Sequence, residues 1–168
     1  QLAQGYGISR SMDSAAEGEP TAERCRVRIL VQEPQAGFHH PAGKREVRTV
    51  LEAIGPVARY GLRSVELVRC PGRGFPAGVA FGRYEAPGRV LLFEQPVPPW
   101  RLPGLLRPED GQRFEHAGAV VTLRRNSGAT LVEWPHGALE RFMLEEVLLH
   151  ELGHHVLQHD KGKRPVRT

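Results

Sequence analysis

Three periodic stretches in the first half of the chain predict two β-strands with a helix between them. In CRVRILVQ, residues 25–32, apolar and basic side chains alternate with the period of a half-buried strand. KREVRTVLEAI, residues 44–54, instead spaces its apolar residues as on one face of a helix, and Gly55-Pro56 ends or kinks that helix. SVELVRC, residues 64–70, predicts the second strand.

The second half predicts more strands and a long final helix. Residues 77–96 contain two strand patterns around the turn Ala86-Pro87-Gly88, and the proline-rich stretch 96–111 is expected to be a loop. AVVTLRR and ATLVEW, within residues 119–134, flank Asn-Ser-Gly and predict a hairpin. A helix is expected from residue 138 to about Gly162. This order of strands and helices predicts an α+β fold.

Length and composition favour one domain preceded by a polar leader. With 168 residues, 40% of them hydrophobic, the chain suits a single core, which we place at residues 25–168. Residues 1–24 are polar and aperiodic. Met12 within them is a candidate native start, so the sequence leaves open whether residues 1–11 belong to the natural protein. No apolar run is long enough for a membrane span and no secretion signal is seen, so the expected location is cytoplasmic.

The charge and the cysteines add weaker expectations. The net charge of +4 and pI near 9.5 permit contact with nucleic acid, but the basic residues are scattered, so an ordinary solvated surface is favoured. Cys25 and Cys70 form no CxxC pair, which argues against a disulfide framework or a cysteine-zinc fold.

The chemistry of the chain is concentrated in HELGHHVLQH, residues 150–159. His150 and His154 are four residues apart, so a helix places both imidazoles on one face, where they can share a metal ion. Glu151 follows His150, about 100° round the helix. In an HExxH pattern zinc lowers the pKa of a bound water to about 7, and the glutamate accepts the water's proton. The residues therefore predict a zinc site with a general base.

The surroundings of the motif strengthen this prediction. The preceding RFMLEEVLL presents an apolar face, so we expect the helix to be packed into the core where the histidines begin. Histidines on a buried face need a partner for each nitrogen, and a metal supplies one. Gly153 costs about 1 kcal/mol relative to alanine inside a helix, so a reason for it is expected, such as close packing of another backbone. His155 is expected beside the site or at the surface rather than as a ligand.

VLLHELGHHVLQH resembles the active-site helix of the zincin metallopeptidases. The resemblance implies Zn²⁺ held by His150 and His154, Glu151 as general base, and hydrolysis of a protein or peptide substrate. It also implies a zincin-like domain, in which a mixed, twisted sheet packs on a supporting helix and on the HExxH helix. Zincins bind extended substrate along an edge strand, and RVLLFE, residues 89–94, is the best match to that strand.

A catalytic zinc takes three protein ligands, and the third is not evident here. His159 and Asp160 are the nearby candidates, with His159 preferred because imidazole suits zinc and adds no charge. On a continuous helix His159 would lie about 140° round from His154, so either candidate can bind the metal only if the chain turns near residues 157–159, which we expect if these 168 residues complete the site. Otherwise the ligand lies elsewhere in the chain or beyond Thr168.

Two other interpretations of the function remain open. A catalytically inactive zincin-like module could bind metal and a partner, with nucleic acid suggested by the basic pI. The other interpretation is a structural domain that binds no metal. Elemental analysis of the purified protein separates it from the peptidase and from the metal-binding module. The sequence leaves the substrate, the cleavage preference and the oligomeric state open.

Overall fold

A computed structural model of the chain describes residues 26–71, 81–124 and 128–162, the last four of these by their backbone alone. The elements in chain order are β1 (Arg28–Val31), β2 (Phe38–His39), α1 (Lys44–Ala53), α2 (Gly55–Arg59), β3 (Ser64–Val68), β4 (Gly82–Glu85), β5 (Arg89–Phe93), β6 (Gln95–Pro96), β7 (Trp100–Pro103), α3 (Pro108–His116), β8 (Val120–Arg124), β9 (Ala129–Glu133), α4 (Ala138–Arg141), the π-helical stretch η2 (Phe142–Leu148) and α5 (Leu149–Gly162). The α+β class is confirmed.

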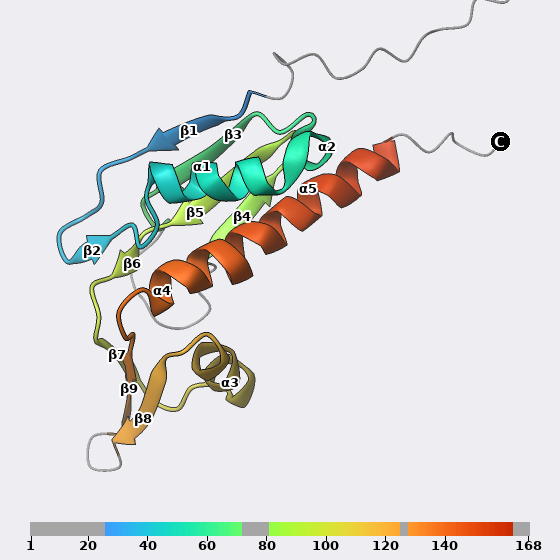
Figure 1. The fold of residues 1–168 in the computed structure, drawn as a ribbon. Helices are drawn as coiled ribbons and strands as arrows, with labels where there is room; N and C mark the ends of the chain where they lie inside the picture. Colours follow the sequence, from blue (N-terminus) through green and yellow to red (C-terminus); the bar gives the residue numbers. More distant parts are fainter. Residues whose placement is uncertain (1–25, 72–80, 125–127, 163–168) are drawn as a thin grey trace, which may run out of the picture.

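The main sheet is mixed and four-stranded, in the order β1-β3-β5-β4. β1, β3 and β5 are parallel, and β4 runs antiparallel to β5 with Gly82 opposite Leu92. Helix α1 and the long helix α4-η2-α5 lie beside each other across this sheet (Figure 1). The main sheet is therefore mixed, and the long helix that carries the HExxH motif packs on it.

Helix α1 confirms the helix expected at residues 44–54. Val47 and Leu51 are buried on its inner face, and Glu46 caps the start by accepting a hydrogen bond from the N–H of Gly43 at 3.2 Å. At Gly55 the backbone φ is +80°, a left-handed conformation that glycine adopts without strain. The helix therefore ends there, and the short α2 that follows was not predicted.

The predicted hairpin is confirmed as β8 and β9, but it does not join the main sheet. It forms a separate three-stranded sheet in the order β7-β9-β8, which lies with α3 below the main sheet in Figure 1. The remaining strands, β2 and β6, make a small antiparallel pair.

The expectation of a loop at residues 96–111 is wrong, because this stretch contains β7 and the start of α3. Trp100 and Leu102 alternate with exposed residues and are 1% and 3% exposed, which is a strand pattern hidden among prolines. Pro108 occupies the first position of α3, where a missing N–H costs nothing. The prolines thus mark element boundaries here.

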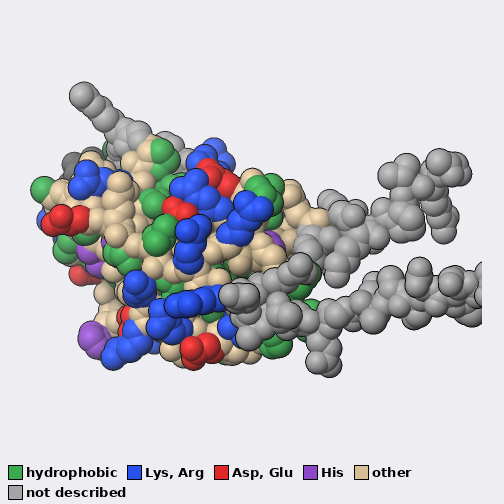
Figure 2. Space-filling model, turned by 90° about the horizontal axis from the view of Figure 1, so that it is seen from above, with side chains coloured by type: hydrophobic (Ala, Val, Ile, Leu, Met, Phe, Trp, Pro, Cys, Tyr) green, Lys and Arg blue, Asp and Glu red, His purple; other side chains and the backbone are tan. Residues whose placement is uncertain are grey.

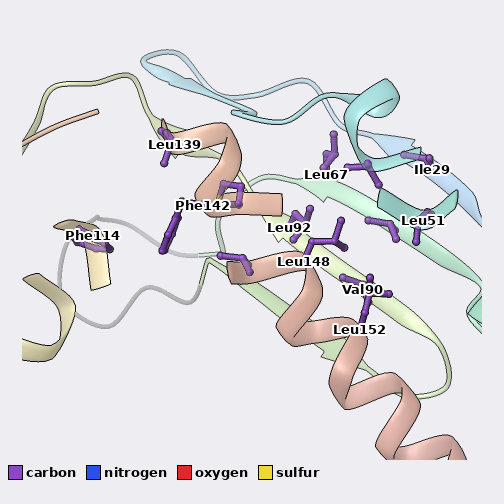
Figure 3. Packing of buried hydrophobic residues seen from close by; sticks show 14 of the residues in the cluster. Ile29, Leu51, Leu67, Val90, Leu92, Phe114, Leu139, Phe142, Leu148 and Leu152 are labelled. Atoms are coloured by element: carbon purple, nitrogen blue, oxygen red, sulfur yellow. The ribbon is translucent and has the colours of Figure 1, made fainter. Parts of the chain in front are cut away.

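The long helix carries the core of the domain. Leu148 and Leu152 point toward Val90 and Leu92 of β5 and toward Leu51 of α1 (Figure 3). Burying a leucine side chain contributes roughly 1.5–3 kcal/mol, so this apolar stripe fixes which face of the helix meets the sheet. The helix predicted from residue 138 to about 162 is confirmed, with η2 as an unpredicted π-helical stretch inside it. No helix in the described part of the chain is long and apolar enough to cross a membrane.

Candidate metal centre

The two motif histidines lie side by side on α5. Nε2 of His150 is 3.0 Å from Nε2 of His154, and the ring centroids are 4.7 Å apart. Two nitrogens that bind one tetrahedral zinc at about 2.0–2.1 Å would be about 3.3 Å apart. The observed separation is close to this value, so the pair could share a zinc ion after a small adjustment.

The expectation that these histidines lie on a buried face is wrong. Both are exposed, whereas Leu148 and Leu152 are buried. Each leucine is two positions from His150, about 200° round the helix, so the core and the histidine pair occupy opposite sides. A substrate or solvent molecule therefore has access to the pair.

Glu151 ties this helix to strand β4. Its side chain is half-buried, and Oε2 accepts a hydrogen bond from the backbone N–H of Tyr84 at 2.8 Å. This contact joins residues that are 67 positions apart in the chain. The carboxylate is therefore held in a defined place at strand β4.

Gly82 allows the strand to approach the helix this closely. A Cβ atom at this position would lie 2.8 Å from Cγ1 of Val147, 2.9 Å from the carbonyl oxygen of Leu91 and 3.3 Å from Cγ of Glu151. The first two distances are shorter than ordinary van der Waals contacts. Any side chain at residue 82 would therefore press β4 away from the helix.

Replacing Gly82 by alanine is expected to lower the free energy of unfolding by about 1–3 kcal/mol, the usual cost of overpacking. Urea denaturation measures this change. Gly153→Ala is the matched control, because a Cβ atom there meets nothing within 4 Å and alanine favours the helix by up to about 1 kcal/mol. A Gly82→Ala protein as stable as the unmodified chain would contradict the close packing described here.

Gly153 also corrects an expectation. No other described backbone packs against it, since the space where its Cβ would lie is open. The residue is exposed on α5, in the turn that separates His150 from His154. Close packing within the described residues therefore does not explain this glycine.

Residues 89–94, which were expected to form an edge strand that binds substrate, do not lie at the edge of the sheet. β5, which contains most of residues 89–94, lies between β3 and β4 and is therefore interior. Its residues from Val90 to Phe93 are all buried, as is typical of a strand covered on both faces. Among the described residues the border strand next to the HExxH helix is β4.

The chain turn near residues 157–159 that a ligand role of His159 or Asp160 requires is absent, because α5 continues unbroken to Gly162, where the helix was predicted to end. The side chains of His159 and Asp160 lie outside the described residues, so their role as third ligand stays a prediction. Within the part of the chain that is described, no group of three or more His, Cys, Asp or Glu side chains could hold a metal ion.

His155 is the buried histidine of this helix, at 3% exposure. Its Nε2 lies 3.0 Å from the carbonyl oxygen of Tyr60, and its ring is 5.8 Å from that of Tyr84. The residue thus connects the HExxH helix to the loop after α2, in agreement with the expectation that it is not a ligand. Nothing in the local pattern distinguished Tyr60, Gly82 or Tyr84 as neighbours of the site.

The remaining described histidines lie apart from the pair. Nε2 of His40 is 2.7 Å from the carbonyl oxygen of Gln32, and burial together with the nearby His40 lowers the pKa of His39. His116 lines a hollow with Arg141, Glu145 and Glu146 at the end of α3.

Neither a protein-family model, nor a curated protein sequence, nor a solved structure matches this chain. The choice between functions therefore depends on the chemistry of the HExxH helix and on the strand beside it.

Proposed function

We propose that this chain is a zinc-dependent peptidase with a zincin-like domain, acting on a protein or peptide substrate. His150 and His154 would hold Zn²⁺, and Glu151 would be the general base. The observation that carries the proposal is the 3.0 Å separation of the two imidazole nitrogens, with a fixed carboxylate on the adjacent residue.

The donor set suits zinc, since neutral imidazole nitrogen is among its preferred ligands. When bound, the metal would polarise a peptide carbonyl and lower the pKa of a water molecule to about 7. Glu151 would accept the proton from that water and then pass it to the departing amine. The bond from Tyr84 to Glu151 supports this role, because it limits where the carboxylate can move.

Strand β4 would take the role first expected of residues 89–94. It has one strand neighbour among the described residues and lies against α5. An extended peptide would add to this border strand through main-chain groups other than the N–H of Tyr84, which donates to Glu151. His159 would be the third zinc ligand in this proposal, with Asp160 as the other candidate. Because α5 is unbroken to Gly162, either role would require the end of this helix to unwind after Val156 when the metal binds.

A second candidate function is metal binding without turnover, in a module that contacts a partner such as nucleic acid. It is favoured by one observation, the lack of a third metal-binding side chain among the described residues. Zinc binding without any hydrolysis, together with salt-dependent binding of DNA, would support this alternative over the peptidase.

The peptidase proposal is tested with a library of quenched fluorescent peptides and protein loaded with one equivalent of zinc. Hydrolysis is expected, and it should disappear with 1,10-phenanthroline and return when zinc is restored. His150→Ala should be inactive. His136→Ala is the control and should keep its activity, because this exposed histidine lies outside the HExxH helix.

Hydrolysis that persists after the metal is removed would contradict the proposal. Equal activity of the His150→Ala and unmodified proteins would do the same. Zinc-loaded protein without activity on any peptide would favour the binding module.

A further inference from the structure

A basic pocket lies at the end of the main sheet where β1 and β3 begin, and no residue of the HExxH motif lines it. Arg26, Arg28 and Arg63 line it together with Tyr60 and Pro87. It is open to solvent and has a volume of about 720 Å³, within the range of small-molecule sites. Figure 2 shows Lys and Arg side chains gathered in groups on the face of the molecule that is seen from above.

The three guanidinium groups have no carboxylate partner among the described residues. The ion pairs seen on the described surface involve other arginines, among them Arg45, Arg83 and Arg89. Glu66 of β3 is bound by two nitrogens of Arg89 at 2.7 and 2.9 Å. The pKa of Glu66 is lowered mainly by Arg89, and Arg28 adds only a weaker effect. Within the described residues, the positive charge of the pocket is therefore offset only in part, by the attraction between Arg28 and Glu66.

Like charges that share one pocket repel each other, and an anion bound among them removes that cost. Guanidinium groups bind phosphate oxygens especially well, because their N–H groups form paired, charge-assisted hydrogen bonds. A phosphoryl group is therefore the ligand that best matches the three arginines.

The backbone around the pocket is held by hydrogen bonds. The N–H of Arg63 donates to the carbonyl oxygen of Gly88 at 2.7 Å, and the N–H of Arg28 donates to the carbonyl oxygen of Arg63 at 3.1 Å. A Cβ atom at Gly88 would lie 2.3 Å from the carbonyl oxygen of Gly61, so the two loops pack very closely. Two of the arginines thus project from a fixed backbone, which lowers the cost of binding.

We propose that this pocket binds a phosphoryl group, either of a small phosphate compound or of a nucleic-acid backbone. The proposal does not depend on the peptidase function, because no residue of the HExxH motif lines the pocket.

The test measures binding of pyrophosphate by calorimetry and of a single-stranded 25-nucleotide DNA by fluorescence anisotropy, both with metal-free protein at fixed ionic strength. Arg28→Gln/Arg63→Gln should bind at least about tenfold more weakly than the unmodified protein, since two charge-assisted contacts are lost. The control, Arg48→Gln/Arg101→Gln, removes the same charge from exposed arginines outside the pocket and should change affinity less than about twofold. Circular dichroism verifies that both variants are folded.

Pyrophosphate binding that only the pocket variant loses would support the proposal and identify a small phosphate compound as sufficient. DNA binding alone, lost in the same variant, would support it with nucleic acid as the source of the phosphate. Equal weakening in both variants would overturn it, because charge rather than the pocket would then determine binding. Failure of the unmodified protein to bind either probe would overturn it as well.

Discussion

Replacing Glu151 by glutamine is expected to lower kcat/KM for peptide hydrolysis at least about a hundredfold while zinc content stays unchanged. An amide cannot accept the proton of the attacking water. Its carbonyl oxygen can still accept the hydrogen bond from Tyr84, which is 2.8 Å long in the unmodified protein, so the helix should stay in place beside β4. The loss would therefore come from chemistry rather than from folding.

Glu145→Gln is the control for this experiment. Glu145 is also a glutamate of the long helix, but it is exposed and lies in η2, before the motif. Its replacement should leave both activity and zinc content unchanged. If Glu151→Gln retains its zinc and hydrolyses peptides within a few-fold of the normal rate, Glu151 is not the general base.

Replacing Phe142 by alanine is expected to lower the free energy of unfolding by about 3–5 kcal/mol. Phe142 is 1% exposed, and its ring centroid lies 5.0 Å from that of Phe81, 5.7 Å from that of Phe114 and 5.4 Å from that of Trp134. The guanidinium carbon of Arg113 lies 4.9 Å from the same ring centroid. Alanine would leave a cavity and remove this cation–π contact.

Phe142 begins η2, and its ring packs on that of Phe114 in α3 (Figure 3). These aromatic side chains therefore join the long helix to α3 beside the three-stranded sheet. Urea denaturation measures the effect. Leu157→Ala is the control, since this side chain is 59% exposed on α5 and its loss should cost less than about 0.5 kcal/mol. A cost below about 1 kcal/mol for Phe142→Ala would show that the aromatic cluster does not hold the two parts of the fold together.

The elements predicted correctly from the sequence are those whose periodicity is local and uninterrupted. Helix α1, the long helix and the β8–β9 hairpin belong to this group, as do the four strands of the main sheet. The pattern failed at residues 96–111, where prolines obscured both the alternation of β7 and the start of α3. The border position of β4 depends on pairing between distant segments, which a local pattern does not specify.

The same distinction applies to the candidate site. His150, Glu151 and His154 were found because helical spacing alone brings them together. The bond from Tyr84 to Glu151 and the close approach at Gly82 were missed because they join the helix to a strand far away in the sequence. The exposure of the histidine pair was missed because the apolar face of η2 was extended too far along the helix.

The central claim is that His150 and His154 bind zinc together, and the zinc affinity of single variants tests it most directly. Competition with a chromophoric chelator should show one zinc per chain, with affinity at least about tenfold lower in His150→Ala and in His154→Ala. His136→Ala should bind like the unmodified protein, and a similar loss in His159→Ala or Asp160→Ala would identify the third ligand. An unmodified protein that binds no zinc, or an affinity that neither His150→Ala nor His154→Ala changes, would contradict the account.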